Sequence, residues 1–198
     1  MGVNLQKGQK ISLEKEAGGS LSRILMGLGW DSSKPAARGF LGGLFGGGDS
    51  EDIDLDASCI LFDEQGNPLD VVWFRQLISQ DGSIRHTGDN RTGEGEGDDE
   101  QIIVNLPAVP VLAKSLVFTV SNYTGQDFSR VQNAFCRIVN ASNQSEIARY
   151  DLSCQGQHTA MIMAKIYRHN DEWKMHAIGE AGQGRTFDQL LPQIVAHL

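Results

Sequence analysis

Alternation of apolar and polar residues over short stretches is the feature that most constrains how this chain can fold. In a β-strand successive side chains point to opposite faces, so each such stretch predicts a strand with one buried face. Many short strands without long helices between them predict a mainly β protein, namely a β-sandwich of short antiparallel strands. The expected strands cover residues 24–30, 53–62, 71–74, 83–87, 101–106, 116–123, 134–139, 146–152, 160–168 and 172–178.

The first residues and the last strand pair predict hairpins. Val3–Leu5 and Lys10–Leu13 are short apolar-polar runs, and Gly8 between them favours a turn. The dipeptide Asn170-Asp171 lies between the last two predicted strands and is typical of a hairpin turn. A short helical turn is expected at Ser129–Ala134.

The C-terminal segment is expected to form a helix. Apolar residues recur at helical spacing along residues 187–195, which predicts an amphipathic helix with Thr186 as its N-cap. Pro192 lies inside this stretch and is expected to kink or shorten the helix, because proline lacks a backbone N–H.

Residues 32–50 interrupt the alternation with a glycine- and proline-rich stretch, which predicts a loop inserted between two strands. A length of 198 residues suits one domain, so we expect a single domain over residues 1–198 that contains this insertion. Its large apolar residues either fold back on the sandwich or contact a partner or a lipid surface. They are Phe40, Leu41, Leu44 and Phe45.

The charge balance and the cysteines narrow the classes of function. The formal net charge is −8 and no basic run is present, which argues against nucleic acid as a partner and favours attraction of cations. The 3 cysteines form no CxxC pair, so we expect buried, reduced thiols and no zinc ribbon. No apolar signal-peptide core is visible and no apolar run approaches the roughly 18 residues of a membrane-spanning helix. We therefore expect a cytoplasmic protein without a transmembrane segment.

Two stretches of the chain concentrate carboxylates. The sequence GDNRTGEGEGDDE at 88–100 holds six carboxylates and one base, and the stretch 49–56 holds five carboxylates. Both stretches adjoin predicted strands, and the alternating glycines allow sharp turns that can present backbone carbonyls to an ion. Asp54 and Asp56 are two apart on one strand, so their side chains point the same way, with Cα atoms roughly 6.7 Å apart.

These carboxylates predict a metal site at one end of a sheet. If the strand that ends at Asp31 pairs with the strand that begins at Asp52, Asp31 lies beside Asp54 and Asp56, and the loop 88–99 can join them. Two like charges about 5 Å apart repel by roughly 0.8 kcal/mol even in water, and a bound cation removes that cost. An all-oxygen set fits a hard cation, and many carboxylates with flexible glycines favour calcium over magnesium.

The positions from Asp89 to Glu100 do not form an EF-hand loop. An EF-hand needs an oxygen ligand at its third position and glycine at its sixth, where this chain has Arg91 and Glu94. Strands are expected on both sides, whereas an EF-hand has helices. His86 precedes this loop and is expected to be a strand residue that is satisfied by hydrogen bonds.

Several blocks of the sequence resemble the TerD family of bacterial tellurite-resistance and stress-response proteins. The blocks are GLGWD at 27–31, DIDLDAS at 52–58, DGSIRHTGDNRTGEGEGDDEQI at 81–102, IARYDL at 147–152 and YRHNDEWKMHAIGE at 167–180. The resemblance covers nearly the whole chain. The glycine- and phenylalanine-containing stretch at 38–48 resembles the TerZ branch of the family.

This resemblance implies a non-enzymatic β-sandwich that binds about two calcium ions in neighbouring loops. It also implies a role in tellurite resistance and stress response, through partners among other tellurite-resistance proteins in a complex at the inner membrane surface. The metal ligands that it implies are Asp31, Asp54, Asp56, Asp89, Asn90, Asp98, Asp99 and Glu100. Glu94 and Glu96 are additional candidates.

Two other functions are open at this point. One is calcium-dependent binding to phospholipid at a membrane surface, in which the acidic loops act together with the apolar residues of 40–45, by analogy with a C2 domain. The other is a thiolate enzyme such as a tellurite reductase. The unpaired cysteines argue against that reading, and no nucleophile–base pair with a recognised spacing is visible. We therefore expect no enzymatic activity.

Overall fold

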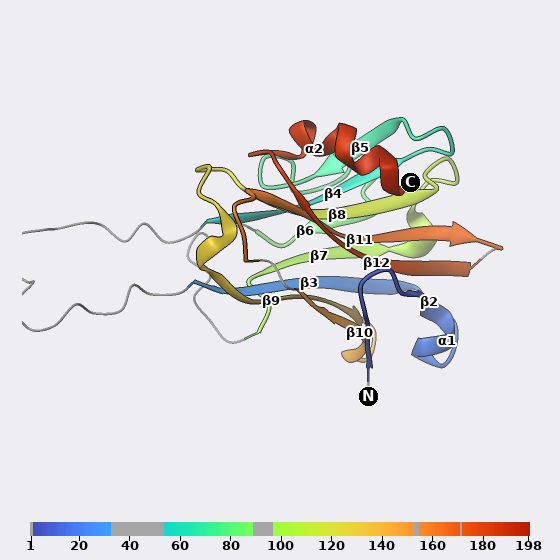
Figure 1. Ribbon diagram of the computed structural model, residues 1–198. Helices are drawn as coiled ribbons and strands as arrows, with labels where there is room; N and C mark the ends of the chain where they lie inside the picture. The colour runs from blue at the N-terminus through green and yellow to red at the C-terminus, as the bar shows by residue number, and fades with distance from the viewer. Residues whose placement is uncertain (1, 33–53, 89–96, 153–154, 171) are drawn as a thin grey trace, which may run out of the picture.

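Two six-stranded β-sheets pack face to face and form a sandwich (Figure 1). The computed structural model describes residues 2–32, 54–88, 97–152, 155–170 and 172–198. The strand order is β1-β10-β9-β3-β7-β6 in one sheet, called sheet A, and β2-β12-β11-β8-β4-β5 in the other, called sheet B. Neighbouring strands are antiparallel apart from β1 and β10, which run parallel. The prediction of a mainly β sandwich is confirmed.

Each strand predicted from residue 24 onward has a counterpart in one of the two sheets. Sheet A contains β1 (Val3–Asn4), β3 (Arg23–Ser32), β6 (Ile84–His86), β7 (Glu100–Asn105), β9 (Val131–Asn140) and β10 (Ser145–Asp151). Sheet B contains β2 (Lys10–Ser12), β4 (Leu55–Phe62), β5 (Pro68–Val72), β8 (Ser115–Asn122), β11 (Ala160–His169) and β12 (Glu172–Gly182). The described helices are α1 (Leu13–Ala17) and α2 (Phe187–Ile194), with 3-10 turns η1 (Leu106–Ala108), η2 (Phe128–Arg130) and η3 (Val195–His197).

Strand β4 shows how the alternation builds the core. One face of the strand lies in the large apolar cluster between the sheets and contributes Leu55, Ala57, Cys59 and Leu61. On the other face, Ile60 and Phe62 belong to a second apolar cluster with Leu190 and Ile194 of α2. The strand is therefore buried on both faces over its second half, which stabilises the centre of sheet B.

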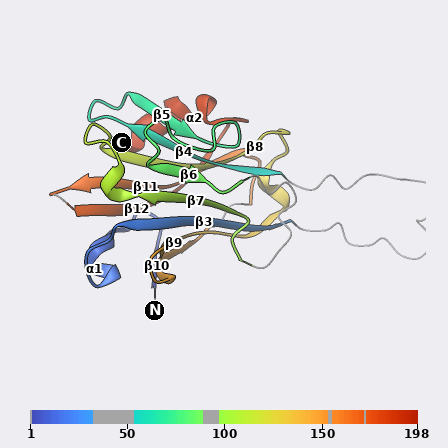
Figure 2. The same ribbon diagram turned by 180° about the vertical axis from the view of Figure 1, so that it is seen from behind.

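Helix α2 covers part of the outer face of sheet B. It lies in front of this sheet in Figure 1 and behind it in Figure 2. Leu190 and Ile194 are fully buried, as expected for the apolar stripe of an amphipathic helix. Pro192 stands inside α2, and the chain continues after Ile194 as the 3-10 turn η3. Thr186 precedes the helix, but its hydroxyl donates to the carboxylate of Asp188 and does not cap a backbone N–H.

The predicted hairpin at the start of the chain is wrong. Strand β1 pairs with β10 of sheet A, whereas β2 pairs with β12 of sheet B. The segment after β2 is helical, because the Ser12 hydroxyl caps α1 by accepting from the Lys15 N–H at 3.4 Å and Gly18, with φ of 74°, ends the helix. The two short strands therefore lie at the edges of different sheets, and the chain passes from sheet A to sheet B between them.

The two strands around the insertion do not pair with each other, so the condition under which Asp31 would lie beside Asp54 and Asp56 in one sheet is not met. Strand β3 lies between β9 and β7 in sheet A, and β4 lies between β8 and β5 in sheet B. The C-terminal end of β3 and the N-terminal ends of β4 and β7 nevertheless lie at the same end of the sandwich, on the left in Figure 1 and on the right in Figure 2. We call this the acidic end. The insertion itself lies outside the described residues, apart from Ser32.

Candidate metal centre

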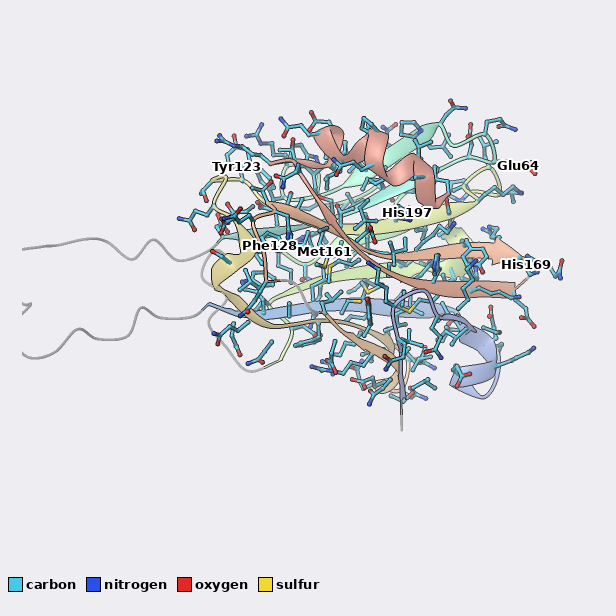
Figure 3. The ribbon with its side chains drawn as sticks, viewed as in Figure 1. Glu64, Tyr123, Phe128, Met161, His169 and His197 are labelled. Atoms are coloured by element: carbon cyan, nitrogen blue, oxygen red, sulfur yellow. The ribbon has the colours of Figure 1, made fainter. Side chains whose placement is uncertain are left out.

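Several of the predicted ligands lie on strand ends that meet at the acidic end. Asp31 is near the last residue of β3, Asp54 directly precedes β4, and Asp56 is the second residue of β4. Asp99 directly precedes β7, and Glu100 is its first residue. Figure 3 labels Tyr123 and Phe128 at this same end, and Glu64 and His169 at the opposite one. The two sheets thus bring three separate parts of the sequence to one end of the molecule.

Asp99 is fixed to the end of β3 by two hydrogen bonds. Its backbone N–H donates to the carbonyl of Leu28 at 2.8 Å, and its Oδ2 accepts the backbone N–H of Trp30 at 2.8 Å. Burial raises the pKa of the Asp99 carboxyl, the Trp30 N–H partly offsets this, and the charges of Asp31, Glu100 and Asp98 raise the pKa further. A carboxylate held in this position is repelled by its neighbours, and a cation would relieve that repulsion.

Asp31 and Asp99 line one depression in the surface of the acidic end. The amide nitrogen Nδ2 of Asn133 donates to Oδ2 of Asp31 at 2.7 Å, which orients this exposed carboxylate. Arg149 stacks over the ring of Phe135, with 3.8 Å between the guanidinium carbon and the ring centre. The depression has a volume of about 290 Å³ and is lined by Trp30, Asp31, Gly97, Asp99, Asn133, Phe135 and Arg149.

Glu100 is buried and connects the two sheets. Its Oε2 accepts the backbone N–H of Ala57 from β4 at 2.7 Å and lies 3.2 Å from Nε2 of His86 on β6. The other ring nitrogen of His86, Nδ1, accepts the N–H of Gly88 at 3.1 Å, so Nε2 carries the proton and donates to Glu100. His86 is therefore satisfied by hydrogen bonds, as predicted. The Glu100 contact places the start of β7 next to Asp56, the residue before Ala57.

Asp98 has a different environment from the other predicted ligands. Its side chain is fully buried, and both carboxylate oxygens bind Arg137 of β9, at 2.7 Å from Nε and 3.0 Å from Nη2. The amide of Gln101 donates to the same carboxylate at 3.2 Å. A bidentate pair of this kind is among the stronger side-chain interactions and fixes the segment before β7 onto sheet A.

Two glycines of β3 allow that segment to approach the sheet. A Cβ on Gly27 would lie 2.3 Å from the Asp98 carboxylate, and a Cβ on Gly29 would lie 2.4 Å from the Phe135 ring and 2.8 Å from the Gly97 carbonyl oxygen. Glycine is costly in a strand, so its presence at both positions follows from this close approach. Gly27 and Gly29 are two residues apart and therefore lie on one face of β3.

The described residues account for part of the predicted ligand set. Asp56 is buried, at 5% exposure, and lies opposite Ser121 of β8 on the outer face of sheet B, while Asp54 is partly buried. Within residues 2–32, 54–88, 97–152, 155–170 and 172–198, no group of three or more His, Cys, Asp or Glu side chains is close enough to hold a metal ion. The predicted ligands Asp89 and Asn90, and the candidates Glu94 and Glu96, lie outside these residues.

Sequence reasoning missed the residues that position the carboxylates. Arg137 binds Asp98, Asn133 orients Asp31, and the backbone of Trp30 holds Asp99. Each of these partners lies at least 39 residues away along the chain from the carboxylate that it binds. No local pattern connects residues at such separations.

The two described cysteines are not reactive thiols. Cys59 and Cys136 are both fully buried. Burial, reinforced by the charge of Asp70, raises the pKa of the Cys59 thiol, and burial raises the pKa of Cys136 to about 12. Both therefore stay protonated near neutral pH. Cys154 lies outside the described residues.

The described helices include none with the length and apolar character needed to cross a membrane.

Comparison with known sequences gives a consistent set of relatives. The chain matches the TerD domain over residues 1–193. It is 48% identical over 194 residues to the tellurium resistance protein TerZ of Serratia marcescens, which covers 98% of this chain and 97% of that protein. Identity to TerD of the same organism is 42%, with 93% of both chains covered. Identity to general stress protein 16U of Bacillus subtilis (strain 168) is 43%, again with 93% of both chains covered.

Comparison with solved structures supports the fold. A crystal structure of a homologue of the telluride resistance protein TerD from Streptomyces coelicolor A3(2) superposes with a TM-score of 0.67 at 20% sequence identity. The match covers 87% of this chain and 96% of that chain. The higher identity to TerZ than to TerD from one organism agrees with the predicted TerZ branch.

Proposed function

Since the chain belongs to the TerD family of tellurium-resistance and stress-response proteins, we propose that it is a calcium-binding module of such a system that acts through protein partners and has no enzymatic activity. Calcium binds at the acidic end and removes the repulsion among its carboxylates. Other tellurium-resistance proteins recognise the calcium-loaded form, in the cytoplasm at the inner membrane surface.

The observation that carries this proposal is the convergence of carboxylates from three parts of the chain on one end of the sandwich. Asp31 and Asp99 line one depression, and Glu100 lies next to the start of β4. The donor set supplies oxygen ligands throughout, which suits calcium. The pKa of Asp99 is raised mainly by burial and further by the charges of Asp31, Glu100 and Asp98, so a bound cation would favour its ionised form.

We assign the described calcium ligands Asp31, Asp54, Asp56, Asp99 and Glu100 to the acidic end, where their strand ends meet. Asp89 and Asn90 lie outside the described residues, and we propose them as ligands from the sequence block that they share with Asp99 and Glu100. Asp98 belongs to the same sequence block, and its contribution is to anchor the block through Arg137. Bound calcium would neutralise the charge of these carboxylates, so the metal would stabilise the folded state.

The test of this function uses cells that depend on this protein for resistance to tellurite. The double variant Asp54→Asn/Asp56→Asn removes two proposed ligands and should abolish resistance at unchanged protein level. The control Glu16→Gln/Glu64→Gln removes the same charge from exposed positions, and Glu64 lies at the opposite end of the molecule (Figure 3). Full resistance in the Asp54/Asp56 variant, or equal loss in both variants, would contradict the proposal.

One observation favours phospholipid binding as the second candidate. Trp73, Phe74 and Phe187 form edge-to-face contacts with centroid distances of 4.7 and 5.0 Å, and Phe74 contacts Tyr123 at 5.6 Å. Arg75 lies within 5.2 to 5.5 Å of Trp73, Phe74 and Tyr123. Tyr123 is 44% exposed and follows Asn122, which pairs with Leu55 at the start of β4.

Aromatic rings with an arginine are typical of surfaces that contact lipid headgroups. If this candidate is right, the protein sediments with anionic vesicles only in the presence of calcium, and Phe74→Ser abolishes sedimentation. Absence of calcium-dependent sedimentation would leave partner proteins as the targets. The apolar residues 40–45, expected to form the lipid contact, lie outside the described residues.

A further inference from the structure

The outer face of sheet B carries a row of basic residues where α2 does not cover it. Lys10 of β2 lies opposite His176 of β12, and His176 lies opposite Lys165 of β11. Residues that are directly opposite in antiparallel strands point to the same face, so the three side chains form one row across three strands. Lys174 is two residues before His176 and lies on the same face.

The C-terminal turn η3 adds a further basic residue beside this row. Figure 3 labels His197 over the middle of the sandwich, away from the acidic end. Lys165 donates from Nζ to the backbone carbonyl of His197 at 2.5 Å. We refer to Lys10, Lys165, Lys174, His176 and His197 as the basic patch.

Lys165 is held in place, unlike a lysine that moves freely in solvent. It is partly buried, its Nζ is bonded to His197, and it lies 5.1 Å from the ring centre of Tyr167. An ammonium group has three N–H donors, so the bond to His197 leaves two for another acceptor. A fixed cation with available donors loses little conformational entropy when it binds an anion.

The basic groups repel one another, and the nearby carboxylates have partners of their own. Burial lowers the pKa of His176, and the charges of Lys10, Lys165 and His197 lower the pKa further. The pKa of Lys165 is lowered by burial and by Lys10. Glu180 pairs with Lys7 at 2.6 Å, and its pKa is lowered mainly by Lys7 and to a smaller degree by His197. Glu172 accepts the Ser12 hydroxyl at 3.0 Å.

We propose that the basic patch is a binding site for a phosphate group, either as free phosphate or on a lipid headgroup. The net charge of the chain is −8, so a concentration of basic groups on one face is contrary to the overall charge of the molecule. A doubly charged oxyanion accepts hydrogen bonds from several ammonium and imidazole donors at once and neutralises their repulsion. The site is separate from the acidic end and does not depend on calcium.

The test follows the ring resonances of His176 and His197 by NMR in a calcium chelator. Inorganic phosphate is added at constant ionic strength with chloride as the balancing anion. Saturable shifts of both histidines are expected, and Lys165→Gln and Lys10→Gln should each weaken binding roughly tenfold. Lys10 is exposed, so its variant keeps the fold, and Lys15→Gln on α1 is the charge-matched control that should bind as the wild type does.

A second arm separates the two sources of phosphate. Vesicles that contain phosphatidic acid are compared with neutral vesicles, again in chelator. If the phosphate is that of a lipid, only the phosphatidic acid vesicles sediment the protein, and Lys10→Gln reduces this. No saturable shift with free phosphate together with no sedimentation would overturn the proposal, as would equal binding by wild type and both patch variants. Because calcium is absent, failure here is distinct from failure of the proposed calcium site.

Discussion

Asp99 illustrates at the scale of a residue how the acidic end is built. The Trp30 N–H and the Leu28 carbonyl fix its position, while burial and the charges of Asp31, Glu100 and Asp98 raise its pKa. The backbone thus holds a carboxylate where ionisation is unfavourable. Such an arrangement is stable when a cation is bound and is under electrostatic strain without one.

Replacing Asp99 by Asn separates charge from geometry. The Asn side-chain oxygen can still accept the Trp30 N–H, but the like-charge repulsion is gone. In chelator at neutral pH we expect the free energy of unfolding to rise by on the order of 1 kcal/mol. In calcium the variant should gain less stability than the wild type. Urea unfolding in both conditions measures this, and a loss of stability in chelator would show that the charge itself supports the fold.

Arg137 offers a test of the anchor of the acidic segment. Replacement by Gln leaves the buried Asp98 carboxylate without its bidentate partner, and the free energy of unfolding should fall by about 2 kcal/mol. The figure is below that for a fully buried pair because the Arg137 side chain is 30% exposed. The double variant Arg137→Gln/Asp98→Asn should recover part of the loss in urea unfolding. Additive losses would mean that the two side chains act independently.

His176 predicts a pH dependence of stability. Its pKa in the folded state lies below the ordinary value of 6.5, because of burial and the charges of Lys10, Lys165 and His197. The unfolded chain therefore binds more protons between that lowered pKa and about 6.5, so stability rises with pH through this window and is lost as pH falls through it. His176→Gln should flatten the difference in unfolding free energy between pH 5.5 and pH 7.5. An unchanged difference would contradict the claim that burial and the other charges of the basic patch lower the pKa of His176.

At the scale of elements, the strands and the hairpin of β11 and β12 were predictable, whereas the partners of β1, β2, β3 and β4 were not. The alternation over residues 53–62 predicted a strand, and β4 has Leu55 and Cys59 on one face and Ile60 on the other, because burial on a pleated strand has a period of two. Helix α1 was missed, since a helix of one turn depends on Ser12 and Gly18 as caps and leaves no periodic pattern. The assignment of β3 and β4 to different sheets rests on contacts between residues far apart in the chain.

At the candidate site, the carboxylates could be predicted from the sequence, whereas the side chains that bind them could not. Local sequence identified the carboxylates and the strands that carry them, because charge density and alternation are local properties. It could not identify Arg137 as the partner of Asp98, or Asn133 as the partner of Asp31, because these contacts form only when sheet A is assembled.

Gly27 connects β3 to the geometry of the acidic end. A Cβ at this position would lie 2.3 Å from the Asp98 carboxylate, so Gly27→Ala must displace that carboxylate, which anchors the segment before β7 through Arg137. We expect a loss of about 1–3 kcal/mol in unfolding free energy and weaker calcium binding, although no carboxylate is altered. Calorimetric titration and urea unfolding measure the two effects. Unchanged calcium affinity in a destabilised variant would show that this segment does not position the ligands.

The molecule as a whole has charge of opposite sign in two regions. Carboxylates gather at the end of the sandwich where β3 ends and where β4 and β7 begin, and basic residues cross the outer face of sheet B beside η3. The described residues of both regions lie on or beside strands of the sandwich. The proposed calcium site and the proposed phosphate site therefore share no residue, and a cation at one would not compete with an oxyanion at the other.

Calorimetric titration of the chelator-stripped protein with calcium, in the presence of millimolar magnesium, tests the central claim most directly. The account predicts saturable binding of about two calcium ions, a higher melting temperature in calcium, and loss of both effects in Asp54→Asn/Asp56→Asn but not in Glu16→Gln/Glu64→Gln. No heat of binding and no change in melting temperature would show that the acidic end is a solvated surface, and the proposed calcium-dependent function would then be wrong.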